Sequence, residues 1–233
     1  MNLIDAQTPV GHLVAERPEL TRVLERLGID YCCGGRKPLA QACQEKSLEV
    51  AEVVARLEDA LAGSGSSCEQ RWLEKSLTEL TRHIEAEHHG YLRRELPRVQ
   101  ALADKVARVH GEGRPDLVTL SRVVQEFSWE LDSHMQKEEQ ILFPMIRQLE
   151  GGGAGPAMGC GSVAGPIRQM ELEHDGAGEA LAEMRRLTGD FQPPMEACGT
   201  WRALYHALAE LEADMHRHVH EENNILFPRA LKL

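Results

Sequence analysis

The sequence HMQKEEQILFP at residues 134–144 recurs as HVHEENNILFP at residues 218–228, and this repeat indicates the fold. Both copies have the frame His-x3-Glu, followed after two further residues by Ile-Leu-Phe-Pro. A weaker echo lies upstream of each copy, because EHHG at residues 87–90 resembles EHDG at residues 173–176. The sequence therefore predicts two copies of one helix pair, each supplying a histidine and then a His-x3-Glu.

This repeat predicts a metal site. Residues i and i+4 of an α-helix lie on one face, about 6 Å apart along the axis, so each His-x3-Glu can direct an imidazole and a carboxylate inward. One such pair alone is usually a solvated ion pair, but two copies before the same apolar tetrad indicate metal binding. Imidazole and carboxylate without thiolate suit iron, manganese or zinc, and two carboxylates that can bridge match a di-iron site in a helix bundle. The candidate ligands are His89, His134, Glu138, His174, His218 and Glu222.

The other histidines have weaker claims. His88 competes with His89 for the first ligand position, although the spacing to Leu96-Pro97 and the repeat favour His89. His83 also lies near His89. We expect His216 and His220, which flank His218, to face solvent, His206 to lie at the surface or behind a ligand, and His110 to cap a helix or pack.

Four long helical stretches are expected at about 70–109, 117–149, 164–188 and 197–230. Glycine- and proline-rich segments separate them, and no run of alternating β-branched residues competes with helix. Pro97 should kink the first stretch. The predicted fold class is all-α, with an antiparallel four-helix bundle over residues 70–233.

A small helical domain is predicted in front of the bundle, over residues 1–62. One helix carries Leu20, Val23, Leu24 and Leu27 and stops at Gly28, a second begins near Pro38, and a third has an apolar face from Val50 to Leu61. A Gly-Ser-rich linker is expected at residues 63–69.

Composition excludes several function classes. The 233 residues are 42% apolar and carry a net charge of −11, which argues against a nucleic-acid partner. No apolar run approaches the roughly 20 residues needed to cross a bilayer, and the first residues lack the features of a signal peptide. Six cysteines in a chain of this length do not form a typical disulfide framework. We therefore expect a cytoplasmic protein with no membrane partner.

The segment DYCCGG at residues 30–35, together with the duplicated His-x3-Glu, resembles the repair-of-iron-centres (RIC) family of hemerythrin-like di-iron proteins. DYCCGG is similar to the signature of that family's N-terminal ScdA-type domain. The resemblance implies that the six candidate ligands bind two iron ions per chain, oxo-bridged and bridged by Glu138 and Glu222. It also implies a bacterial stress-response function, in which iron–sulfur proteins damaged by nitric oxide or peroxide are repaired.

Cys32 and Cys33 are the candidate iron-transfer or redox thiols. A low-pKa thiolate beside flexible glycines could approach a client protein, and thiolates are soft ligands for iron in transit. We treat the other cysteines, which lack ligand spacing, as incidental: Cys43, Cys68, Cys160 and Cys198. Whether the chains form a homodimer is left open.

Two alternative functions use the same iron site. One is an enzyme, a nitric oxide reductase that forms nitrous oxide. The other is a hemerythrin-type protein that binds or senses oxygen or nitric oxide without turnover. The Cys-Cys domain favours repair, because reversible gas binding needs no thiols.

Overall fold

The computed structural model describes residues 4–63, 72–152 and 162–233. Over these ranges the ordered elements are helices, and the only strand-like pairing is one isolated bridge between Pro9 and Pro38. The predicted all-α class is therefore confirmed. None of the described helices is long and apolar enough to cross a membrane. Most of the predicted linker lies outside the described residues, and so do Cys68 and Cys160.

The chain divides into two compact units. One is formed by Thr81–Met215, and the other by Met1–Leu80 together with His216–Leu233.

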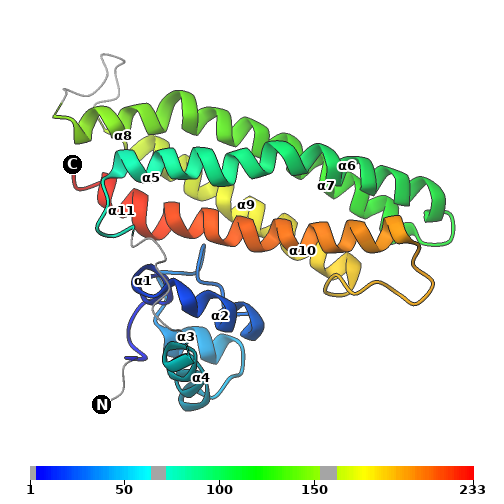
Figure 1. Ribbon diagram of the computed structural model, residues 1–233, viewed down its shortest axis with the longest axis horizontal. Coiled ribbons are helices and arrows are strands. Elements are labelled where there is room, and N and C mark those ends of the chain that lie inside the picture. The colour runs from blue at the N-terminus through cyan, green and yellow to red at the C-terminus, as the bar shows by residue number, and fades with distance from the viewer. Residues whose placement is uncertain (1–3, 64–71, 153–161) are drawn as a thin grey trace. The chain divides into compact units, whose positions relative to one another are not determined.

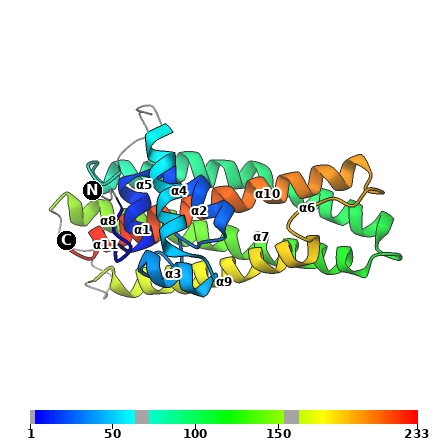
Figure 2. The ribbon, with the colours of Figure 1, turned by 90° about the horizontal axis from the view of Figure 1, so that it is seen from below.

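In the unit Thr81–Met215 the long helices run side by side, as Figures 1 and 2 show. They are α6 (Gly90–His110), α7 (Pro115–Lys137), α9 (Ala164–Thr188) and the larger part of α10 (Gly199–His220). A short turn joins α6 to α7, so these two helices are antiparallel, as predicted. The unit also contains α8 (Phe143–Glu150).

Helix ends in this unit follow local rules. Pro115 is the first residue of α7, where its fixed φ suits a helix start and its missing N–H costs nothing. Gly189 ends α9 in the left-handed conformation, with φ 58°. Pro97 lies inside α6, which remains one helix from Gly90 to His110, and the kink expected there stays a prediction.

The second unit has short helices around its own apolar core. In chain order they are α1 (Val10–Glu16), η1 (Pro18–Leu20), α2 (Thr21–Leu27), α3 (Leu39–Glu45) and α4 (Val50–Gly63). Leu20, Leu24, Leu39 and Leu57 are completely buried in this core. As predicted, Gly28 ends α2, with φ 64°.

The C-terminal segment of the chain belongs to the same unit. It comprises the last residues of α10, then η4 (Glu221–Leu226) and α11 (Phe227–Ala230). Because η4 packs against α1, the end of the chain contacts the N-terminal helices directly.

Candidate metal centre

Three of the candidate ligands, His89, Glu138 and Glu222, lie in π-helical segments that sequence reasoning did not foresee. These are η2 (Glu85–His89), η3 (Glu138–Leu142) and η4 (Glu221–Leu226). η2 follows α5 (Leu77–Ile84), and each segment interrupts a helix that was expected to be continuous. Single π-helical turns inside α-helices are rare and concentrate at functional sites.

A sequence signal for two of these segments was present. Phe143-Pro144 follows η3 directly, and Phe227-Pro228 follows η4. Proline has no N–H to donate to the carbonyl four residues back, so the regular ladder of hydrogen bonds cannot continue unchanged past it. The Phe-Pro pair of the repeat is therefore part of the local geometry of the site.

Glu138 is surrounded by imidazoles. Its Oε1 lies 3.3 Å from Nε2 of His134, and its Oε2 lies 3.3 Å from Nε2 of His89. The Glu138 side chain is fully buried. His174 joins them, since its Nε2 lies 3.1 Å from Nε2 of His134. Four side chains from three helical stretches thus direct ligand atoms at one another.

Two further carboxylates, which we call the outer carboxylates, contact the Nδ1 atoms of His89 and His134 and so orient these imidazoles. Nδ1 of His89 lies 2.7 Å from Oε1 of Glu139, and Nδ1 of His134 lies 2.9 Å from Oε2 of Glu173. A carboxylate beside Nδ1 holds the proton there and leaves the lone pair of Nε2 for a metal. Hydrogen bonds from His134 and Lys137 lower the pKa of Glu173 to about 2, against the opposing effect of burial. Glu173 is therefore ionised at neutral pH.

Glu139 has the same arrangement on the other side. Although burial alone would raise its pKa, hydrogen bonds from Arg93 and His89 lower it below the usual value. Sequence reasoning missed both outer carboxylates. The signal was available, because Glu139 follows a candidate ligand directly and Glu173 precedes one.

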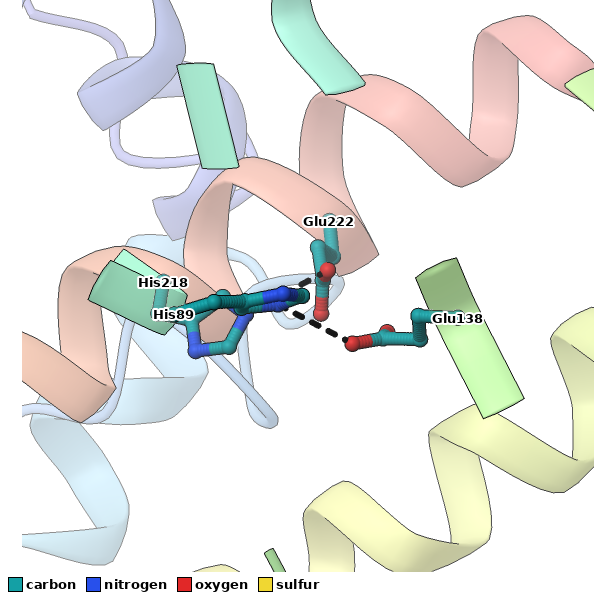
Figure 3. Close-up of side chains that lie close together, drawn as sticks. All are labelled: His89, Glu138, His218 and Glu222. Carbon is teal, nitrogen blue, oxygen red and sulfur yellow. Dashed lines mark ion pairs between the residues drawn. The ribbon is translucent and has the colours of Figure 1, made fainter. Parts of the chain in front are cut away.

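The second copy of the repeat supplies a histidine–glutamate pair that matches His134 and Glu138. Nε2 of His218 lies 3.4 Å from Oε1 of Glu222, and both side chains are fully buried. In Figure 3 the carboxylates of Glu222 and Glu138 point toward the rings of His218 and His89.

The six predicted ligands fall into two groups of four. One contains His89, Glu138, His218 and Glu222, the other His134, Glu138, His174 and Glu222, and the ligand atoms in each group lie within 4.8 Å of one another. Glu138 and Glu222 belong to both groups.

This donor set fits a metal ion. Ligand atoms about 2.1 Å from one ion and at right angles to each other are about 3 Å apart, close to the separations around Glu138. Buried carboxylates without a cation are costly, and a bound divalent ion would offset that cost. Oxygen and imidazole donors are the ligands of non-haem iron in helix bundles.

Comparison with known proteins identifies the fold family. Residues 86–230 match the hemerythrin HHE cation-binding domain, which covers all six candidate ligands. The chain belongs to the hemerythrin HHE family. Residues 6–61, in front of this HHE domain, match a domain of unknown function, DUF542.

Relatives match along almost the whole length of this HHE protein. The iron-sulfur cluster repair proteins YtfE of Citrobacter koseri and Escherichia fergusonii are each 40% identical to it over 224 residues, covering 96% of both chains. The protein of the same name from Escherichia coli O81 is 41% identical over the same length. The resemblance to RIC proteins is therefore confirmed.

The structure assigns different surroundings to the neighbouring histidines of the HHE domain. His88, the competitor of His89, instead places Nδ1 3.1 Å from Asp214. His206 is exposed and lies beside Glu210, whereas His110 packs against the ring of Trp201.

The expectation that His220 faces solvent is wrong. Its side chain is buried, and Nδ1 lies 3.3 Å from the carbonyl oxygen of Tyr31. Burial lowers its pKa to about 4, so the ring is neutral at pH 7. Because the contact is with a residue far away in the sequence, helix periodicity could not reveal it. His216, by contrast, is half-exposed with its ring edge-on to Tyr31.

The cysteine pair also differs from expectation. Cys32 is buried, and its Sγ lies 3.1 Å from Oδ1 of Asp30 and 4.0 Å from Sγ of Cys33. The hydrogen bond with Cys33, burial and the nearby Asp30 carboxylate raise the pKa of Cys32. The prediction of a low-pKa thiolate is therefore wrong for Cys32. Cys33 is the more exposed thiol of the pair.

The loop carrying these cysteines is bound to η4. Nδ2 of Asn224 donates to the carbonyl oxygens of Tyr31 at 3.2 Å and of Cys32 at 3.0 Å. A side chain at either Gly11 or Gly35 would overlap Oδ1 of Asn224. These glycines thus leave the space in which Asn224 reaches the loop.

Proposed function

We propose that this chain is a di-iron protein that repairs damaged iron–sulfur clusters by supplying iron. The observation that carries the proposal is the connection of two features at η4: the same π-helical segment contains Glu222 and holds the Cys32-Cys33 loop through Asn224. A gas-binding protein has no need of such a loop beside its ligands. The relatives named iron-sulfur cluster repair proteins support the same function.

The proposed centre holds two iron ions per chain. His89 and His218 would bind one ion, His134 and His174 the other, and Glu138 and Glu222 would bridge both because each belongs to both groups. When bound, the iron pair supplies ferrous ions and a place where nitric oxide or oxygen can bind. The outer carboxylates keep the imidazoles of His89 and His134 in the ligating tautomer.

Iron is also the cargo in this proposal. Oxygen and imidazole donors hold ferrous iron less tightly than thiolates, so iron tends to pass from the bundle to cysteine-rich clients. Cys33 is the thiol we assign to the transfer, since it is more exposed than Cys32. Its binding to iron would release a proton, as thiol ligands must be deprotonated.

The test is delivery of iron to a client. Iron-loaded protein is added under anaerobic conditions to an iron–sulfur dehydratase inactivated by nitric oxide, and both the recovered activity and the iron on each protein are measured. We expect activity to return as iron leaves the bundle. Recovery without iron loss, or nitrous oxide released over many turnovers with iron retained, would contradict the proposal.

Matched cysteine variants test the role of the loop. Cys33→Ser should keep the iron content and slow the recovery of the client. Cys198→Ser serves as control, because Cys198 is exposed and lies outside the loop. Equal recovery by both variants would exclude Cys33 from the transfer.

A further inference from the structure

A third group of ligand-type side chains lies outside the proposed iron centre. It consists of His83, His88 and Glu221, whose ligand atoms lie within 4.8 Å of one another. None of the three belongs to the groups around Glu138 and Glu222. Two imidazoles and a carboxylate are a common donor set for divalent transition metals.

The π-helical segment η2 explains how the two histidines come together. His83 and His88 are five residues apart, a spacing that places side chains on different faces of a regular α-helix. η2 covers Glu85–His89, and π-helical hydrogen bonds join residues i and i+5. The wider turn brings the rings to a centroid separation of 5.7 Å in an edge-to-face arrangement.

Asp214 orients one of these rings. Its Oδ1 lies 3.1 Å from Nδ1 of His88, and both side chains are buried. A carboxylate at Nδ1 leaves Nε2 as the ligating atom, which is the arrangement seen behind His89 and His134. His83 is only half-buried, so an ion can reach the group from solvent.

We propose that His83, His88 and Glu221 bind one divalent transition-metal ion, with Asp214 as the residue that orients His88. This site is separate from the iron centre, because His88 and His89 follow each other in the chain and consecutive helix side chains point in different directions. It binds more weakly than the iron centre because two of its three ligands, His83 and Glu221, are half-exposed. The proposal concerns metal binding alone and does not depend on the repair function.

Cobalt(II) is a suitable probe, since its visible absorption reports nitrogen and oxygen ligands. Full-length protein already loaded with iron is titrated with cobalt, and bound cobalt and retained iron are both measured. We expect one cobalt ion per chain to bind while the iron content stays constant. Cobalt uptake matched by an equal loss of iron would overturn the proposal.

Variants locate the ion. His83→Ala should weaken cobalt binding roughly tenfold or more, and Asp214→Asn should weaken it by about 10–100-fold, as loss of an orienting carboxylate does at other metal sites. His206→Ala is the matched control, because His206 also pairs with a glutamate but is exposed on α10. His83→Ala is the deciding variant, since its half-exposed side chain can be removed with little risk to folding. Cobalt binding by His83→Ala equal to that of the wild type would overturn the proposal.

Discussion

Asn224→Ala should free the Cys32-Cys33 loop. The wild-type side chain donates two hydrogen bonds to loop carbonyls, at 3.2 and 3.0 Å. Each such bond contributes about 0.5–1.5 kcal/mol net, so the variant should weaken attachment of the loop by about 2 kcal/mol. That corresponds to a roughly 30-fold rise in the population of the open loop.

Alkylation of Cys32 measures this opening. The thiol is buried, so a reagent can modify it only when the loop opens, and the rate follows the open population when closing is fast. Mass spectrometry of the peptide with Cys32 separates it from the other cysteines. We expect modification about 30-fold faster than in the wild type, with iron content unchanged. Gln41→Ala, which removes an exposed hydrogen bond to Glu45 in the same unit, should change nothing.

A second substitution checks the physical reason. Gly11→Ala adds a methyl group that would overlap Oδ1 of Asn224, so it should also open the loop. In the Asn224→Ala background that overlap is gone, and the same substitution should cost much less. An acceleration below about fivefold for Asn224→Ala, or additive effects in the double variant, would refute the proposed attachment.

Three further predictions concern the bundle. Glu138→Ala removes a ligand from both groups and should reduce iron below two ions per chain by elemental analysis; full retention would contradict its bridging role. Glu173→Gln should weaken iron binding by about 10–100-fold in chelator competition, whereas Glu183→Gln, at an exposed ion pair with Arg186, should not. Hydrogen bonds from the Trp201 backbone and His110 lower the pKa of Cys198 to about 7, so its alkylation rate should rise with pH through a midpoint near 7, and His110→Ala should move that midpoint upward.

Helix periodicity and the internal repeat were enough to predict the bundle and its candidate ligands. The repeated His-x3-Glu places His134 with Glu138, and His218 with Glu222, one helical turn apart, at 3.3 and 3.4 Å. These contacts are local, because four residues of helix determine them. The choice of His89 rather than His88 also came from the repeat, and His89 is the one that faces Glu138.

The side chains that hydrogen-bond the ligand histidines could be identified only from the folded chain. Glu139 reaches His89 across 50 residues of sequence, and Glu173 reaches His134 across 39. A periodic pattern shows which face of a helix is buried, but it does not identify the partner on another helix.

The same limit explains the two wrong expectations. The immediate sequence neighbours of His220 and Cys32 predict a solvated ring and a reactive thiolate. Both are buried where His220 and Asn224 contact the loop at Tyr31 and Cys32, and His220 lies 189 residues after Tyr31 in the chain. Burial lowers the pKa of His220, whereas the hydrogen bond with Cys33 and burial together raise the pKa of Cys32. Which groups lose water depends on contacts made only when the chain has folded.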